Sequence, residues 1–343
     1  MSASAWNGRL TMAREANTKI QHYVPQYYLR GFVNERKQLY VVDRPRAKFF
    51  RVPTNKVAGE LYFNLVTIGG VNPFAVEEAL SEMEGKIAPV LEKVISTRSL
   101  GDESDRNAIM NLIASVTLRN PKQRAAVGEI YRGAGQLAGG AGLDTKEKYA
   151  EFVAAMKAEG LPAPTYEEMK GWFEKEPELF KPPPPSKEFN ILVELEWHDP
   201  LVKLYEGRKW QMLVAADDSG GFVTSDHPVC LRWMDGQDHG ETSPGFAVPG
   251  TKVIFPLSQK LALLGRFEGD ESVVPADKET VARINSLLIG NCHRQVYGRD
   301  ALFSYKRGPK GEIGSGAHLD KDEAFLAGGK DDESGKIVAF RSE

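Results

Sequence analysis

The sequence contains little cysteine, no long apolar run and almost no net charge. Two cysteines among 343 residues, Cys230 and Cys292, cannot form a disulfide framework or, by themselves, a structural zinc site. Lys and Arg number 44 and Asp and Glu 47, a formal net charge of −3 that excludes a generally basic nucleic-acid coat but leaves a local basic groove open. No segment approaches the roughly 20 apolar residues that cross a bilayer. We therefore expect a cytoplasmic globular protein with no membrane partner.

Several common catalytic motifs are also absent. The sequence has no G-x-x-x-x-G-K-[ST], H-E-x-x-H, G-x-S-x-G or C-x-x-C, which argues against P-loop phosphoryl transfer, zincin chemistry, an α/β-hydrolase elbow and thioredoxin-like redox chemistry. The glycine-rich stretch GAGQLAGG at 133–140 resembles a dinucleotide-binding loop in part. It ends a helical pattern instead of following a strand, so it does not predict a nucleotide cofactor.

Strand patterns flank a helical middle. Alternating apolar residues occur at 38–52 and again between 210 and 266, whereas apolar residues recur at helical spacing from 76 onward. These patterns predict an α+β fold in which small N-terminal and C-terminal antiparallel strand segments form a sheet and a long helical middle region packs against it.

The same patterns predict the organisation of the chain. We expect a flexible lead at 1–19 and a single discontinuous domain at 20–300. A helical insertion at about 123–186 would end in a stiff extended proline run. The Gly-, Lys- and Asp-rich residues 301–343 are expected to be loosely ordered.

Three polar residues on the predicted helices lie beside apolar stripes. Glu77 and Glu84 are two helical turns apart on one line; they either pair with nearby lysines or form a carboxylate pair for proton transfer or a divalent metal. Arg119 extends the buried edge of the next helix, where it requires a carboxylate or an anionic ligand. It either pairs with one of these glutamates or binds a substrate anion.

Three further polar positions have two interpretations each. His22 lies among tyrosines before a helix start and is either a structural residue or a base or metal ligand. Asp226 follows a strand and either closes an Asx turn or acts in catalysis. Asn285 lies on the apolar face of the last long helix, where its amide either orders a loop or lines a pocket.

Seven sequence blocks carry a family resemblance. They are IQHYVPQYYLRGF (20–32), GELYFN (59–64), VEEALSEMEGKIAPVL (76–91), TLRNP (117–121), FVTSDHPV (222–229), VIFPLS (253–258) and RIN (283–285). Their order over roughly residues 19–300 resembles the bacterial domain of unknown function 4238 family, whose members look like H-Y-x-P-Q-x-Y-L-x-x-F followed by these later blocks. His227 departs from the commoner T-S-D-N-P pattern, so its place in a site is in doubt. The residues that match family motifs are His22, Pro25, Gln26, Glu60, Glu77, Glu84, Arg119, Ser225, Asp226, Pro228 and Asn285.

Spacing and resemblance together indicate one polar site. Our first hypothesis is an intracellular hydrolase-like enzyme, a nuclease or phosphoesterase of bacterial stress response or phage defence. His22 would be general base or ligand, Glu84 and Asp226 metal ligands or acid/base groups, and Arg119 the clamp for developing negative charge. The substrate-binding candidates are Gln26, Glu60, Glu77, Ser225 and Asn285. The cofactor is unknown, with a divalent metal left open.

The second hypothesis is a non-catalytic interaction or sensor module in which the same residues form a structural ion-pair network. An open cluster with unmet hydrogen-bond capacity would favour the enzyme, and a sealed, fully paired cluster would favour the module. Nucleic acid remains an unsupported partner at this stage, because Lys122, Arg124 and Arg132 near Arg119 do not form one stripe.

Overall fold

The computed structural model describes residues 20–158, 164–236, 244–308 and 311–328. The predicted lead at 1–19 lies outside these residues. The chain divides into two compact units, one formed by 1–121 with 191–343 and the other by 122–190. The helical insertion predicted at about 123–186 falls in the second unit.

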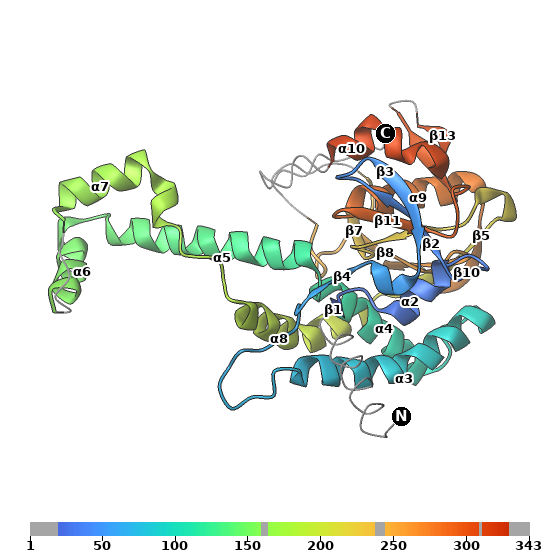
Figure 1. The fold of residues 1–343 in the computed structure, drawn as a ribbon, viewed down its shortest axis with the longest axis horizontal. Coiled ribbons are helices and arrows are strands. Elements are labelled where there is room, and N and C mark those ends of the chain that lie inside the picture. Colours follow the sequence, from blue (N-terminus) through green and yellow to red (C-terminus); the bar gives the residue numbers. More distant parts are fainter. Residues whose placement is uncertain (1–19, 159–163, 237–243, 309–310, 329–343) are drawn as a thin grey trace, which may run out of the picture. The chain divides into compact units, whose positions relative to one another are not determined.

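The helices, as labelled in Figure 1, are α2 (Gln26–Leu29), α3 (Ala75–Thr97), α4 (Glu103–Leu118), α5 (Pro121–Gly142), α6 (Lys146–Ala158), α7 (Tyr166–Lys175), α8 (Lys187–Glu206), α9 (Lys278–Asn291) and α10 (Glu323–Ala327). The strands are β1 (Ile20–His22), β2 (Leu39–Asp43), β3 (Lys48–Val52), β4 (Gly59–Leu61), β5 (Lys209–Ala215), β6 (Thr224–Ser225), β7 (Cys230–Trp233), β8 (Thr251–Ser258), β9 (Leu261–Arg266), β10 (Ser272–Ala276), β11 (Gln295–Gly298), β12 (Ser304–Arg307) and β13 (Glu312–Ser315). Two short 3-10 turns matter below, η2 (Thr54–Lys56) and η5 (Gly316–Lys321).

The first unit contains sheets that join distant parts of the sequence. A four-stranded antiparallel sheet has the order β3-β2-β11-β6, so the N-terminal hairpin pairs with strands from the C-terminal half. A five-stranded sheet has the order β10-β5-β9-β8-β7; its pairs are antiparallel except β5 with β10, which are parallel. The predicted α+β fold, with terminal strand segments and a helical middle region, is confirmed.

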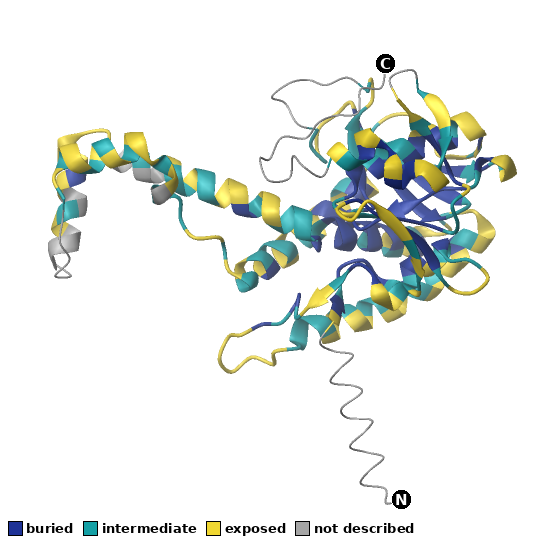
Figure 2. Cartoon of the chain, turned by 45° about the horizontal axis from the view of Figure 1, so that its top comes forward, coloured by how far each residue is buried: buried dark blue, intermediate teal, exposed yellow. Residues whose placement is uncertain are grey.

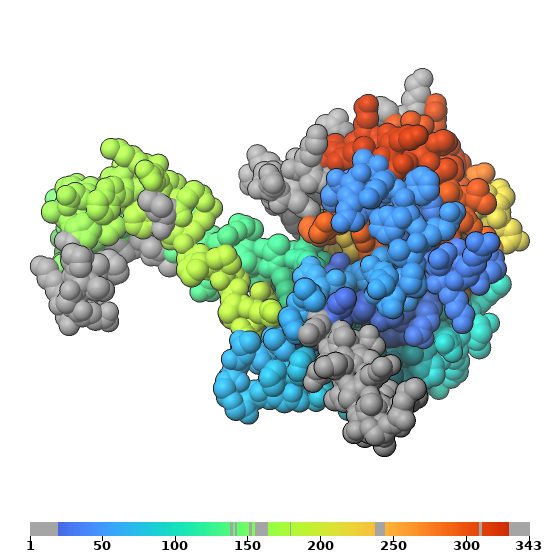
Figure 3. Space-filling view, viewed as in Figure 1, coloured from blue at the N-terminus to red at the C-terminus, as the bar shows by residue number. Residues whose placement is uncertain are grey.

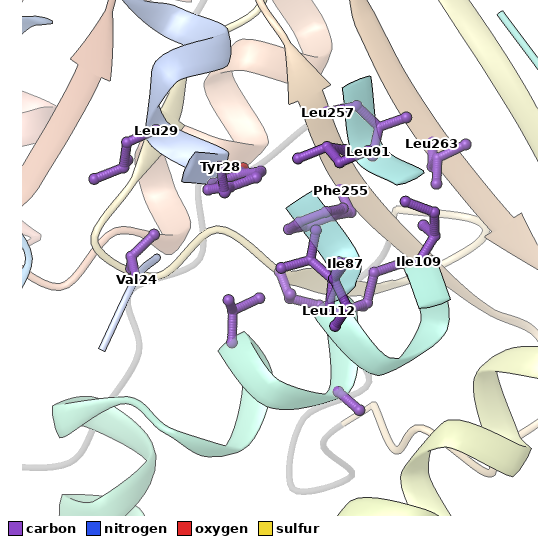
Figure 4. Close-up of a cluster of buried hydrophobic side chains, with 14 of the residues drawn as sticks. Val24, Tyr28, Leu29, Ile87, Leu91, Ile109, Leu112, Phe255, Leu257 and Leu263 are labelled. Carbon is purple, nitrogen blue, oxygen red and sulfur yellow. The ribbon is translucent and has the colours of Figure 1, made fainter. Parts of the chain in front are cut away.

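The core follows from the alternation of side chains along β8. Phe255 and Leu257 contribute to an apolar cluster with Ile87 of α3 and Leu112 of α4 (Figure 4). Ile254, on the other face of the same strand, belongs to a second cluster that includes α9. Figure 2 shows the buried residues concentrated in the sheets and the helices against them. The five-stranded sheet is therefore covered by helices on both faces.

The connection between α3 and α4 fixes where the candidate site lies. Arg98 adopts a left-handed conformation at the end of α3, with φ of 53°. Asp102 then caps α4, because its side chain accepts a hydrogen bond from the Asp105 main-chain N–H at 3.0 Å. The two helices pack against each other, and Arg119 caps the far end of α4.

The prediction that residues 301–343 are loosely ordered is wrong for the part that the structure describes. Residues 304–307, 312–321 and 323–327 form β12, β13, η5 and α10. Phe303, Tyr305, Leu319 and Phe325 are almost fully buried in the second apolar cluster. These four widely spaced apolar residues anchor a segment whose average composition is polar, and an average over the segment conceals them.

The second unit is built on α5. A Cβ added at Gly135 would lie 2.5 Å from the Pro182 ring, so α5 and the proline run are in close contact there. α7 begins with a capping box between Thr165 and Glu168. None of the helices in the described residues has the length and apolar character that crossing a membrane requires.

Candidate functional site

Arg119 lies at the C-terminal end of α4 and is 5% exposed. Its Nη2 donates to the main-chain oxygen of His22 on β1 and to Oε1 of Glu84 on α3, both at 3.3 Å. The arginine thus connects the end of one helix to the middle of another and to the short N-terminal strand. Of the two partners that helical spacing allowed, Arg119 pairs with Glu84.

A second chain of hydrogen bonds extends from the same strand. The Asn64 main-chain N–H donates to Gln21 Oε1 at 2.6 Å, and Asn64 Nδ2 donates to Glu77 Oε2 at 3.0 Å. Glu77 also acts electrostatically on both His22 and Glu84. These contacts join six side chains, here called the Arg119 cluster: Gln21, His22, Asn64, Glu77, Glu84 and Arg119.

Several buried nitrogen atoms of this cluster have no hydrogen-bond partner among the described residues. They are Gln21 Nε2, His22 Nε2, Arg119 Nε and Arg119 Nη1. Leaving a buried donor unsatisfied costs about 1–3 kcal/mol, and more when the group is charged. An acceptor supplied by a ligand would remove this cost. The Glu84 side chain is 26% exposed, so the cluster reaches the surface.

The His22 ring is held in one orientation. It forms a hydrogen bond with the Asn55 main chain, while its Nε2 has no partner in the described parts of the chain. Burial lowers the pKa of His22 from its ordinary value of 6.5, although Asn55 and Glu77 act in the opposite direction. At neutral pH the imidazole is therefore uncharged, with a fixed ring and a free nitrogen.

Glu84 has the opposite shift. Burial raises the pKa of its carboxyl above the ordinary 4.5, even though Arg119 beside it favours the ionised form. Burial also raises the pKa of Tyr27, whose phenol feels the charges of Glu84 and Arg119. The cluster therefore holds a neutral imidazole and a carboxyl whose protonated form burial favours, a candidate base and a candidate acid.

Asp226 has different surroundings from Arg119. Its carboxylate accepts hydrogen bonds from the main-chain N–H groups of His293, Arg294 and Gln295 at 2.8, 2.7 and 2.9 Å. Burial raises the pKa of Asp226, and these donors oppose the rise. The main-chain oxygen of Asp226 accepts from Asn120 Nδ2 at 2.6 Å, which ties this strand end to the residue after Arg119. The carboxylate itself is occupied in holding the entry to β11, which favours its structural interpretation.

The remaining polar residues of the TSDHP block and of α9 are likewise paired. Asn285 accepts from the Val223 N–H and donates to the main-chain oxygens of Gly221 and Ser304. Ser225 Oγ accepts from the His227 N–H at 3.1 Å. Asn285 therefore orders the loop before β6, as the structural interpretation of its buried position expected.

Two predicted site residues lie at the margin of the cluster. Gln26 opens α2 and is half-buried, while Glu60 is exposed on β4, opposite Gln21 in the strand register. No group of three or more His, Cys, Asp or Glu side chains in the described residues is arranged to hold a metal ion. The structure brings His22, Glu77, Glu84 and Arg119 together. The carboxylate of Asp226 is instead bonded to the main-chain N–H groups of residues 293–295.

Sequence reasoning missed Gln21, Asn64 and Asn120. Gln21 is fully buried between Ile20 and His22, which are more exposed. A polar residue at the inward position of a strand was the signal, but β1 is too short for its alternation to stand out. Asn120 directly precedes Pro121, which favours a helix boundary and gave no hint of its bond to Asp226.

The chain is thus an α+β protein with a buried polar cluster between its N-terminal strand and two long helices. The family model described as "Protein of unknown function (DUF4238)" matches residues 20–301. The chain therefore belongs to this family. No curated protein and no solved structure matches it.

Proposed function

We propose that the protein is a hydrolase-like enzyme that cleaves phosphoesters and binds the phosphoryl group at the Arg119 cluster. One observation carries the proposal: Arg119 is 95% buried, and within the part of the chain that the structure describes two of its donor nitrogens have no partner, nor do the nearby Gln21 Nε2 and His22 Nε2. Arginine presents several N–H groups in a planar fork that matches phosphate oxygens. A phosphoryl group would supply acceptors for the Arg119 and Gln21 donors, and the neutral His22 Nε2 beside them could accept a proton.

The acid/base groups give the proposed reaction a complete proton balance. A water oxygen attacks phosphorus while His22 Nε2 takes the proton of that water. The bond from phosphorus to the leaving oxygen breaks, and Glu84 in its protonated form, which burial favours, gives its proton to that oxygen. Arg119 stabilises the charge that develops on the non-bridging oxygens. No step in this scheme requires a metal.

A second candidate function is the non-catalytic interaction or sensor module. The Arg119 to Glu84 ion pair at 3.3 Å and the saturated carboxylate of Asp226 favour it, because both are bonds that hold elements together. In this alternative the unpartnered donors would bind an anion without cleaving it. Turnover separates the two functions, whereas anion binding does not.

The test is a turnover assay with four substrates: a phosphomonoester, a phosphodiester, and single- and double-stranded oligonucleotides, each with and without added divalent cation. We expect cleavage by the wild type and a fall of about 100-fold or more in kcat/KM for His22→Gln and Arg119→Lys. His318→Gln, at an exposed histidine in η5, is the control and should keep full activity. Absence of turnover on all four substrates, or equal turnover in His22→Gln and wild type, would refute the proposal.

The conservative variant Glu84→Gln tests the acid separately. It should lower kcat more than KM, because its proton is needed only as the leaving oxygen departs. Glu92→Gln changes an exposed glutamate on the same helix and should behave as wild type. The wild-type profile of kcat/KM against pH should be bell-shaped. Because the pKa of His22 is lowered, the rise on the acid side should occur below pH 6.5, and because the pKa of Glu84 is raised, the fall on the alkaline side should occur above pH 4.5. Loss of the alkaline limb in Glu84→Gln identifies the acid.

A further inference from the structure

Positive charge is concentrated in one short segment of this weakly acidic protein. Residues 30–56, here called the basic segment, contain eight Lys and Arg and two carboxylates, a net charge of +6. The rest of the chain has 36 Lys and Arg and 45 carboxylates, a net charge of −9. The near-zero total therefore conceals a strong local asymmetry, and a polyanion is the partner that such an asymmetry attracts.

The charge of the basic segment lies on the surface. The exposed cations are Arg30, Arg36, Lys37, Arg46, Lys48, Arg51 and Lys56. Glu35 is exposed among them, whereas the Asp43 side chain is buried and accepts a hydrogen bond from Gln295 at 2.7 Å. Among the described residues, the ion pair in this segment is the one between Arg46 and Asp43 at 3.6 Å. Arg44 is buried and donates to main-chain oxygens, whereas the other six exposed cations of the segment are available to a ligand.

The backbone sets these cations out along a hairpin edge. β2 and β3 are antiparallel, with Leu39 opposite Val52 and Asp43 opposite Lys48, and β3 is the outer strand of its sheet. Arg46 and Lys48 lie at the tip of the hairpin, and Arg51 lies further along β3. Five strand residues span about 17 Å, enough to follow several phosphates of one nucleic-acid strand. In Figure 3 these N-terminal residues form part of the visible surface, in blue.

An exposed aromatic ring accompanies the charges. The Phe49 side chain is 49% exposed and stacks on Tyr40 with ring centres 5.3 Å apart. The Arg51 guanidinium lies 5.6 Å from the centre of the same Tyr40 ring. Tyr40 supports one face of Phe49, and the exposed part of the ring can receive a base. Stacking on aromatic rings beside a basic groove is how proteins bind unpaired bases without sequence preference.

The basic segment leads to the Arg119 cluster. η2 follows β3 directly, and Asn55 within it forms the main-chain hydrogen bond that orients the His22 ring. Lys56, the next residue, is exposed. A nucleic-acid strand bound along β3 toward η2 would therefore approach His22.

We propose that the basic segment binds the backbone of single-stranded nucleic acid, with a base stacked on Phe49. This binding does not depend on catalysis. The extension that this nucleic acid is the substrate of the Arg119 cluster rests on the proposed function.

The test compares two triple variants of equal charge change. Arg46→Gln/Lys48→Gln/Arg51→Gln removes three cations of the hairpin, and Lys203→Gln/Lys209→Gln/Lys278→Gln removes three exposed lysines elsewhere in the first unit. Binding of a labelled 20-nucleotide single strand is measured by fluorescence anisotropy across a salt series. The hairpin variant should bind at least about tenfold more weakly. The slope of log affinity against log salt should become less negative, by up to about two. The lysine control should retain affinity and slope.

Phe49→Leu separates stacking from charge. It keeps an apolar side chain but removes the ring, so single-strand affinity should fall about tenfold while duplex affinity stays unchanged. Circular dichroism verifies that each variant folds, and Lys48→Gln alone replaces the triple variant if that one does not. Wild type that fails to bind single strands at low salt would overturn the proposal. Equal losses in both triple variants, or tighter binding of duplex than of single strand, would overturn it as well.

A cleavage measurement distinguishes this inference from the proposed function. If both hold, the hairpin variant should lose cleavage of the oligonucleotide and keep cleavage of a small phosphodiester. If the wild type binds single strands through the hairpin and cleaves neither substrate, the binding inference stands and the proposed function falls. If the small diester is cleaved and single strands are not bound, the proposed function stands and the binding inference falls.

Discussion

The first unit contains two buried polar regions, and they differ in how far their hydrogen bonds are satisfied. In the Asp226 region, the carboxylate oxygens accept from three main-chain N–H groups, and Asn285 bonds to three main-chain groups. In the Arg119 cluster, four buried nitrogens of three side chains have no partner among the described residues. Both regions come from the blocks that carry the family resemblance, so membership of those blocks does not separate them.

The difference indicates what each region is for. A buried polar group that satisfies main-chain donors contributes to stability, because removing it leaves those donors without water or partner. A buried arginine with unpartnered N–H groups costs stability, and proteins tolerate such a cost where function needs it. We therefore infer that the Asp226 region stabilises the fold and that the Arg119 cluster binds a ligand.

The largest stability effect is expected at Asp226. Replacing the buried Asp226 by Ala leaves three main-chain N–H groups without their acceptor, so the free energy of unfolding should fall by about 3 kcal/mol. Urea unfolding followed by fluorescence measures this change. Asp217→Ala, at an exposed aspartate that pairs with Lys260, should have a much smaller effect. A loss at Asp226 as small as that at Asp217 would remove the contrast between the two regions.

A smaller stability effect is expected in the Arg119 cluster. The double variant Arg119→Met/Glu84→Gln removes both charges together, so no buried charge is left unpaired. Its free energy of unfolding should lie within about 1 kcal/mol of wild type, or above it, while anion binding is lost. Urea unfolding of the double variant and of the Arg119→Met single variant checks this. A fall of more than about 3 kcal/mol in the free energy of unfolding of the double variant would mean that the Arg119 cluster also stabilises the fold.

The smallest effect concerns the pH dependence of stability. Because burial raises the pKa of Glu84, the folded protein holds this proton more tightly than the unfolded chain. The stability due to Glu84 is therefore fully present below the ordinary pKa of 4.5 and is lost as pH rises through the raised pKa; each tenfold change in the ionisation constant corresponds to about 1.4 kcal/mol.

Unfolding measured from pH 4 to pH 8 should show that Glu84→Gln gains stability relative to wild type as the pH rises. Glu92→Gln should run parallel to wild type over the same range. His22 acts in the opposite sense: its pKa is lowered, so its share of stability is present above pH 6.5 and is lost as pH falls. Parallel curves for wild type and Glu84→Gln would show that the carboxyl is not desolvated.

Local spacing predicted the parts of the fold and site that depend on one element. Helical spacing placed Glu84 and Arg119 at the edges of buried stripes and Asn285 on a buried face, and the structure has them there. The partners of Asp226 lie 67 to 69 residues away in the chain, and no local pattern identifies them. The pairing of β2 with β11 and the anchoring of 304–327 by a few apolar residues depend on the same long-range contacts.

The basic segment shows a second reason why sequence-based prediction was incomplete. Its charge was visible in the sequence, but the total of −3 averages it against acidic residues elsewhere. Counting charge in windows would have revealed residues 30–56. Only the structure shows that Asp43 is buried and that seven of the cations are exposed.

Titration calorimetry with inorganic phosphate tests the central claim most directly, because it asks whether the unpartnered donors of Arg119 take up an anion. We expect saturable binding of one phosphate per chain to the wild type, no measurable binding to Arg119→Met, and unchanged binding to the hairpin variant Arg46→Gln/Lys48→Gln/Arg51→Gln. Equal binding by wild type and Arg119→Met, or no binding by wild type, would show that Arg119 does not hold an anion.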